Sequence, residues 1–127
     1  MRRLLLDTHV ALWALSTPNE LAPHVRAALE DPRNEVVVSA ASVWEVEIKR
    51  AIGKLDAPDG FGSACAGRGF DALEISFSHA EVAGALPLHH GDPFDRMLIA
   101  QALVEGLELV TKDPAFAQYG IQVVAPS

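Results

Sequence analysis

Four acidic side chains lie at positions where a carboxylate is costly unless something compensates its charge. Asp7 and Asp113 follow apolar runs that are typical of buried strands, and Glu45 and Asp95 fall on the apolar faces of expected helices. Carboxylates gathered at one place repel each other, and a hard divalent cation such as Mg²⁺ or Mn²⁺ relieves that repulsion. Such an ion lowers the pKa of a bound water and positions it for in-line attack on phosphorus. The four acids therefore predict a metal site suited to phosphodiester hydrolysis, provided that the fold brings them together.

Helical geometry distinguishes Glu45 from its neighbour Glu47. Glu45 shares a three- and four-residue spacing with the apolar residues of its segment, which are Ala41, Ile48 and Ile52. Glu47 lies about 200° further round the helix and stands three residues before Arg50. We therefore expect Glu45 to face the core and Glu47 to face solvent.

The same test separates Asp95 from Asp92. Asp95 lines up with the apolar residues of the following turns, which are Leu98, Ile99 and Ala102. Asp92 precedes Pro93, a residue that suits the first turn of a helix, so Asp92 is expected to be the N-cap. Asp95 is thus the second helical acid with an unusual, core-facing position.

Each acid also has a structural alternative when it is taken alone. Asp7 could cap the helix that starts near Thr8, and Asp113 could cap the short helix that follows it. Asp95, in a first helical turn, also suits the helix dipole. Together, two acids at strand ends and two on core-facing helical positions are more than capping requires.

Strands and helices alternate along the chain that must position these acids. The expected strands cover residues 3–6, 36–39, 71–76, 107–111 and 121–124. The expected helices cover residues 8–15, 21–30, 39–52, 79–86, 93–105 and 113–119, and the four glycines of 56–69 allow only a short or irregular helix. This order predicts one α/β domain over residues 1–127, a three-layer sandwich with a mainly parallel central sheet of about five strands. Ligand sites in such sheets lie beyond the carboxyl ends of the strands.

The composition indicates a soluble globular protein. The net charge of −7 weighs against a nucleic-acid partner unless the carboxylates gather around a cation. Cys65 is the only cysteine, so an intrachain disulfide is impossible and a cytoplasmic location is expected. No apolar run approaches the roughly 18 residues of a membrane span, and Asp7 interrupts the first apolar stretch, so neither a membrane span nor a signal peptide is expected.

Four segments of the sequence carry a resemblance to a known family. They are LLLDTHVALW, VSAASVWEVEIKRAIGKL, LPLHHGDPFDRMLIAQA and LVTKDPAF, in this order and across nearly the whole chain. In these segments the sequence resembles the PIN-domain ribonucleases, and specifically the VapC-type toxins of bacterial toxin–antitoxin pairs. Any one segment would be weak support, whereas the four together are specific.

The resemblance implies a Mg²⁺- or Mn²⁺-dependent endoribonuclease whose acidic quartet corresponds to Asp7, Glu45, Asp95 and Asp113. It implies that Asp7 and Asp95 are direct metal ligands, that Asp113 holds the metal or a coordinated water, and that Glu45 orients or deprotonates the attacking water. It further implies an RNA substrate, a small cognate antitoxin whose tail blocks the site, and at least a homodimer.

Several neighbouring residues are weaker candidates for contact with the site or the substrate. Thr111 could hydrogen-bond a ligand carboxylate, Arg96 could guide phosphate, and His9 could face the site from the first helix. The same holds for the loop residues His89 and His90, for Lys112 beside Asp113, and for a basic cluster of Lys49, Arg50 and Lys54 that is either a solvated helix face or an RNA track. Trp13 and Trp44 are expected in the core or at a subunit contact.

Two other functions fit parts of the pattern. A phospho-accepting receiver domain has a similar size, an α/β sheet and an acidic Mg²⁺ pocket, but it needs paired acids after the first strand, where Asp7 stands alone. It also needs a phospho-acceptor after a central strand, whereas Glu45 is inside a helix. The third possibility is a catalytically inactive PIN-like binding module.

Overall fold

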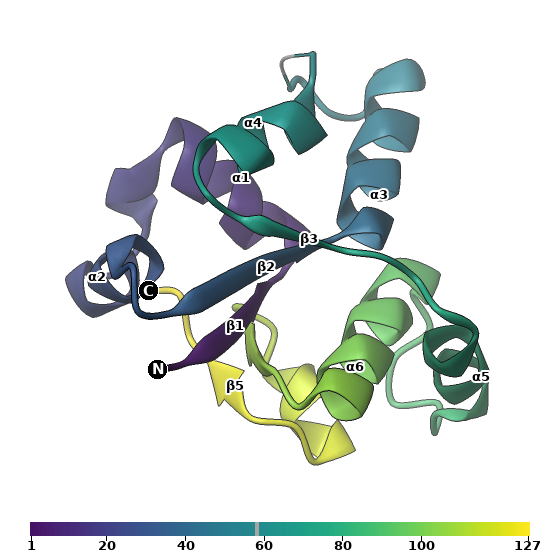
Figure 1. Cartoon of the computed structure of the whole chain (residues 1–127). Helices are drawn as coiled ribbons and strands as arrows, with labels where there is room; N and C mark the ends of the chain where they lie inside the picture. The colour runs from purple at the N-terminus through teal and green to yellow at the C-terminus, as the bar shows by residue number, and fades with distance from the viewer. Residues whose placement is uncertain (58) are drawn as a thin grey trace.

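A single parallel sheet forms the centre of the molecule in the computed structural model, which describes residues 1–57 and 59–127. Its strands are β1 (Arg3–Leu6), β2 (Glu35–Ser39), β3 (Asp71–Leu73), β4 (Glu108–Val110) and β5 (Val123–Val124). Their order is β3-β2-β1-β4-β5, and every neighbouring pair is parallel (Figure 1). The expected five-stranded parallel sheet is therefore confirmed. β1 and β4 lie side by side near its middle, so their carboxyl ends open at the same edge.

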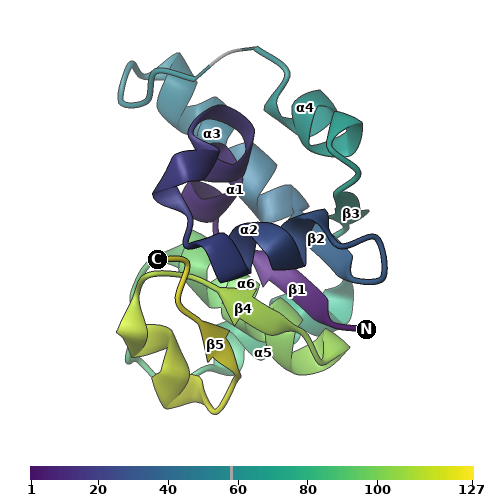
Figure 2. The same cartoon turned by 90° about the vertical axis from the view of Figure 1, so that its left-hand side faces the viewer.

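Helices cover both faces of this sheet. They are α1 (Thr8–Ser16), α2 (Pro23–Glu30), α3 (Ala40–Ala51), α4 (Phe61–Gly67), α5 (Phe77–Ala85) and α6 (Pro93–Glu105), with 3₁₀ turns η1 (Pro18–Glu20) and η2 (Pro114–Tyr119). Figure 2 shows α1 to α4 on one side of the sheet and α5 and α6 on the other. The three layers expected from the sequence are thus present.

The alternation of side chains along the strands divides the core into two halves. Leu4 and Leu6 of β1 pack with the apolar residues of α1, α2, α3 and α4, whereas Leu5 between them packs with α6 and Phe116. Successive residues of a strand point to opposite faces, so the continuous run LLL serves both layers. All three leucines are at most 1% exposed, which fixes the strand that leads into Asp7.

Several boundaries differ from those expected. The strand expected over 71–76 ends at Leu73, and the helix expected from residue 79 begins at Phe77. The reason is a capping box, in which Ser76 accepts a hydrogen bond from the His79 backbone and the His79 ring accepts one from the Ser76 backbone. The helix expected from residue 21 begins at Pro23, whose fixed φ suits the first helical position.

The end of α3 has a consequence for the site. Gly53 adopts a φ of 73°, a left-handed conformation that favours glycine. The chain turns back there, and the Lys54 backbone N–H donates to the Lys49 carbonyl oxygen at 2.8 Å. Lys54 therefore lies beside the last turn of α3 and does not extend beyond it.

Among the described residues, none of the helices combines the length and the apolar character needed to span a bilayer.

Candidate functional site

Asp7 lies at the carboxyl end of β1 and has donors on both carboxylate oxygens. Its Oδ1 accepts a hydrogen bond from the Thr8 backbone N–H at 2.7 Å, which caps α1. Its Oδ2 accepts a hydrogen bond from the Thr111 hydroxyl, also at 2.7 Å. Thr111 follows the neighbouring strand β4 and is 1% exposed. Asp7 is therefore a helix cap, but its second oxygen is held toward the sheet edge by a residue from another strand.

Glu45 enters the same region from the first turns of α3. It is 7% exposed, whereas Glu47 is exposed and pairs with Arg50, as the helical periodicity predicts. The Thr8 hydroxyl lies 2.7 Å from Glu45 Oε1 and 2.9 Å from Ser42 Oγ. Because a carboxylate can only accept, the Thr8 proton is donated to Glu45. Lys49, one turn further along, contacts Glu45 Oε2 at 2.7 Å.

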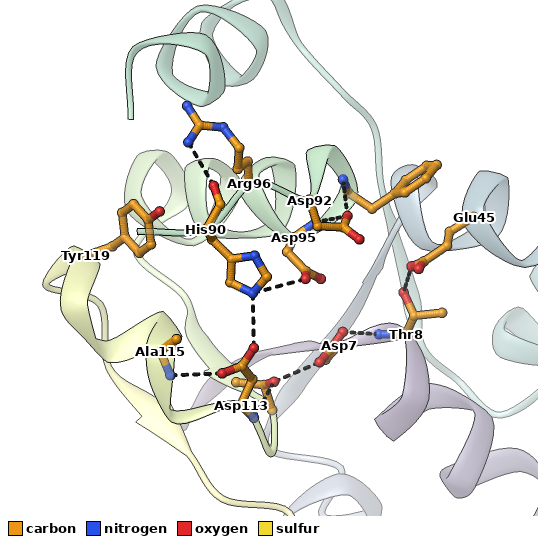
Figure 3. A network of polar contacts seen from close by, with 12 residues as sticks. Asp7, Thr8, Glu45, His90, Asp92, Asp95, Arg96, Asp113, Ala115 and Tyr119 are labelled. Carbon is orange, nitrogen blue, oxygen red and sulfur yellow. Dashed lines mark hydrogen bonds and ion pairs between the residues drawn. The ribbon is translucent and has the colours of Figure 1, made fainter. Parts of the chain in front are cut away.

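Asp95 and Asp113 come together around a histidine ring. His90 Nε2 lies 3.0 Å from Asp113 Oδ2 and 3.3 Å from Asp95 Oδ2 (Figure 3). The other oxygen of Asp113 accepts the Ala115 backbone N–H at 2.9 Å, so Asp113 also caps η2. The His90 ring is packed edge-on against Phe116. His90 thus links an acid on α6 to an acid after β4.

The carboxyls of this cluster differ in their affinity for protons. Burial, followed by repulsion from Asp92 and Asp7, raises the pKa of Asp95 to about 7. Burial also raises the pKa of Asp7, against the lowering effect of its Thr111 and Thr8 hydrogen bonds. The Ala115 N–H and then His90 lower the pKa of Asp113. Asp7 and Asp95 therefore hold a proton more readily than an ordinary aspartate does, whereas Asp113 ionises more readily.

This donor set fits a hard divalent cation in chemistry. The side chains offer carboxylate oxygens, the ligands that Mg²⁺ and Mn²⁺ prefer. The charges of Asp92 and Asp7 raise the pKa of Asp95, a repulsion that a cation would relieve. In residues 1–57 and 59–127, however, no group of three or more His, Cys, Asp and Glu side chains has the arrangement that would hold a metal ion. Asp95 and Asp113 are instead linked by His90, whose Nε2 contacts both of them.

Thr111, Arg96 and His9, which the sequence offered as weaker candidates, have different surroundings. Thr111 bonds Asp7 as described above. Arg96 directs its guanidinium to the backbone carbonyl oxygens of the preceding segment, which belong to Ala83, Leu86, Pro87 and His90. Its donors are thereby used within the fold, so Arg96 fixes the segment that carries His90 and does not face a phosphate. His9 is exposed on α1 and lines a cavity that Glu45 also borders.

The sequence did not predict two contacts of the site, that of His90 with Asp95 and Asp113 and that of Lys49 with Glu45. His90 stands in a loop, and nothing in the sequence indicates that Arg96 holds that loop over Asp95 and Asp113. Lys49 has a signal, because it stands four residues after Glu45, a spacing that places the two side chains side by side on a helix. The structure therefore adds one histidine and one lysine to the four acids.

Comparison with known proteins gives consistent matches. Residues 4–122 match the family model described as PIN domain. Ribonuclease VapC22 of Mycobacterium tuberculosis is 35% identical over an alignment of 118 residues, and the match covers 89% of this chain and 88% of that protein. A chain of a toxin–antitoxin complex from Klebsiella pneumoniae is 25% identical with a TM-score of 0.64, over 98% of both chains.

A further match concerns the fold alone. A chain in the crystal structure of VapBC2 from Rickettsia felis, bound to a DNA fragment from its promoter, has a TM-score of 0.72 at 15% identity. The match covers 96% of this chain and 97% of that chain. The resemblance stated from the four sequence segments is thereby confirmed in both sequence and fold.

Proposed function

Because the chain belongs to the PIN-domain family, we propose that it is a metal-dependent endoribonuclease that acts as the toxin of a toxin–antitoxin pair. The observation that supports the proposal is a chain of contacts that links the four acids: Thr8 bonds Asp7 and Glu45, Thr111 bonds Asp7 and Asp113, and His90 contacts Asp95 and Asp113. Asp7 follows β1 and Asp113 follows β4, while Glu45 and Asp95 come from the first turns of α3 and α6. The name of the relative at 35% identity, a ribonuclease, supports the same reaction class. The family match does not support a receiver domain.

In this proposal Asp7, Asp95 and Asp113 hold a Mg²⁺ or Mn²⁺ ion, directly or through a coordinated water. When bound, such an ion makes a water molecule a stronger nucleophile and neutralises charge on the phosphate. Thr111 keeps Asp7 in position through its bond to Oδ2. Because His90 Nε2 contacts both Asp95 and Asp113, the His90 ring would compete with an ion for these oxygens.

Glu45 orients the attacking water and accepts its proton. The Thr8 hydroxyl and the Lys49 ammonium each engage one of its oxygens, which restricts the carboxylate to a single orientation. The remaining lone pairs of these oxygens can accept a hydrogen bond from water. Thr8 is also the residue whose N–H bonds Asp7, so one residue positions two of the four acids.

The partners in this proposal are an RNA substrate, a cognate antitoxin and a second copy of the chain. One structural relative is a chain of a toxin–antitoxin complex, which supports the antitoxin as a partner. Large apolar side chains on the surface support a protein contact, since Phe77, Leu88 and Trp44 are 90%, 89% and 62% exposed. Trp44, expected in the core or at a subunit contact, is thus outside the core of this chain.

The experiment that tests the proposal measures cleavage of labelled single-stranded RNA with Mn²⁺, with Mg²⁺ and with a chelator. We expect cleavage only when a divalent ion is present. Glu45→Gln should lower the cleavage rate at least a hundredfold, because general base and orienting groups contribute about 10²–10⁴-fold. Glu47→Gln, on the same helix but exposed, is the matched control and should cleave at the wild-type rate. A wild-type protein that leaves RNA intact would contradict the proposal and identify an inactive binding module instead.

A further inference from the structure

A cavity of about 270 Å³ opens beside Glu45, between α1, α3 and the chain that follows α3. Its charged and polar walls include Glu45, Lys49, Lys54 and His9, while Leu12 and Leu55 give it an apolar side. The cavity is therefore continuous with the acidic site but differs from it in charge. Two lysines, Lys49 and Lys54, line this space, whereas the other ionisable residues named at this sheet edge are mostly acids.

The structure divides the basic cluster of the sequence into two parts. Arg50 does not line the cavity. Its guanidinium instead contacts the Ala57 carbonyl oxygen at 2.8 Å, Glu47 at 3.3 Å, and Asp59. The left-handed conformation of Gly53 turns the chain back, so that Lys54 lies beside the last turn of α3. Lys54 lines the cavity there. Lys49, Arg50 and Lys54 are close in the sequence, but of these three only Lys49 and Lys54 line the cavity that Glu45 borders.

Among the described residues, Lys54 differs from most other cations in having no carboxylate partner. Arg2, Arg3, Arg33 and Arg50 are paired with carboxylates, and Arg68 and Arg96 donate to backbone carbonyl oxygens. Lys49 is paired with Glu45. Within the part of the chain that the structure describes, no carboxylate lies within ion-pair distance of Lys54. An ammonium left free beside a site for a polyanion is available to a phosphate group.

From these contacts we infer that the cavity holds the RNA phosphate adjacent to the one that is cleaved, with Lys54 as its main contact. The inference rests on the proposed ribonuclease function. A chain with a net charge of −7 repels RNA, so local cations must hold the strand as it enters the acidic edge. Lys49 and His9 lie at the same cavity, and Leu12 and Leu55 offer an apolar wall to a ribose. The strand then runs from the four acids toward the end of α3.

An acidic segment of a protein partner carries the same charge and is the competing occupant. RNA is favoured as the occupant because the cavity borders Glu45. When one phosphate of a strand lies at the acids, the next phosphate must lie on one side of the site or the other. Elsewhere in the site the carboxylates repel each other, since the charges of Asp92 and Asp7 both raise the pKa of Asp95. The lysine side is the one that attracts phosphate.

The test is the salt dependence of RNA binding by the full chain, measured by fluorescence anisotropy with a labelled single-stranded oligonucleotide in chelator. Loss of one phosphate contact reduces the slope of log K against log salt by about 0.7 for a single strand. We expect Lys54→Gln to show this smaller slope and to bind RNA at least threefold more weakly than the wild type. Lys54→Arg keeps the positive charge and should have the slope and the affinity of the wild type. Arg33→Gln, which removes one charge from an arginine whose side chain is 83% exposed, should keep the wild-type slope.

The outcomes separate this inference from the function on which it rests. If the wild type cleaves RNA but Lys54→Gln keeps the full slope and affinity, the phosphate subsite is wrong. If Lys54→Gln weakens only the binding of an oligoglutamate peptide, the cavity serves an acidic protein segment and the inference is likewise overturned. If the wild type does not cleave RNA with Mn²⁺, the proposed function fails whatever Lys54 does. Circular dichroism melting confirms that each variant is folded.

Discussion

The Thr111 hydroxyl donates to Asp7 Oδ2 at 2.7 Å, and this bond joins the carboxyl ends of the neighbouring strands β4 and β1. Thr111 is 1% exposed, and its own oxygen also accepts the Asp113 backbone N–H at 3.2 Å. One buried hydroxyl therefore holds two of the four acids in register across the sheet. This relationship leads to the first prediction.

Thr111→Val should weaken Mn²⁺ binding about tenfold to a hundredfold, the usual effect of removing a group that orients a metal ligand. Valine has nearly the same shape but cannot donate, so Asp7 Oδ2 loses its partner. The free energy of unfolding should fall by about 1–3 kcal/mol. Isothermal titration with Mn²⁺ measures the first effect and urea unfolding the second. Thr111→Ser restores the donor, and if it binds Mn²⁺ no better than the valine variant, the hydroxyl has no positioning role.

Asp95 should make the metal-free protein less stable as the pH rises. Its pKa is about 7 in the folded protein against an ordinary 3.8, so the folded state binds the proton more tightly than the unfolded state does. The stabilisation from this proton is complete below about pH 4 and is lost as the pH rises through 7. In chelator, Asp95→Asn should therefore gain about 2–4 kcal/mol over the wild type between pH 4 and pH 8.

Urea unfolding at several pH values measures this difference for Asp95→Asn. The control is Asp56→Asn, an exposed carboxyl whose replacement should change stability by less than about 0.5 kcal/mol at every pH. A constant difference between Asp95→Asn and the wild type across this range would show that Asp95 is not held protonated.

Arg96 should be a structural residue. Its loss should release the segment that carries His90, although Arg96 itself does not contact the four acids in the hydrogen bonds of its guanidinium. Its guanidinium donates to carbonyl oxygens of the segment before α6, among them those of Ala83 at 2.9 Å and His90 at 3.1 Å. Arg96→Met should lower the free energy of unfolding by about 2–4 kcal/mol, since hydrogen bonds to charged groups contribute about 1.5–3 kcal/mol each and part of this set is exposed. Arg96→Lys should rescue little, because an ammonium cannot reproduce the planar fork.

Urea unfolding with Arg26→Met as a control tests this role. Arg26 makes one exposed hydrogen bond, to Asn19 at 3.1 Å, so its loss should cost less than about 0.5 kcal/mol. If Arg96→Met is as stable as Arg26→Met but binds RNA more weakly, Arg96 contacts phosphate after all.

The parts of the fold that periodicity controls could be predicted from the sequence. The preference for Glu45 over Glu47 follows from the apolar stripe of α3, and the structure leaves Glu45 7% and Glu47 much more exposed. Asp92 is the N-cap of α6, as its position before Pro93 predicts, and it accepts the N–H groups of Phe94 and Asp95. Local rules of spacing and capping suffice for these residues because their partners are close in the chain.

What escaped prediction depends on contacts between distant segments. The position of His90 is fixed by Arg96 and by Asp113, which is 23 residues away, and no short-range pattern carries that information. The separation of Lys54 from Arg50 depends on where the chain turns after α3 and on Asp59, with which Arg50 pairs. Whether the acids converge on one ion depends on side-chain positions that periodicity does not set.

The most direct test of the central claim measures RNA cleavage by the wild type, Asp7→Asn and Asp95→Asn, each with Mn²⁺ and with a chelator. We expect the wild type to cleave RNA with Mn²⁺ and not with the chelator. Asp7→Asn and Asp95→Asn should cleave at least a hundredfold more slowly, and both should still melt as folded proteins. Both variants cleaving at the wild-type rate would contradict the assigned site. Cleavage by the wild type in chelator would contradict the metal dependence.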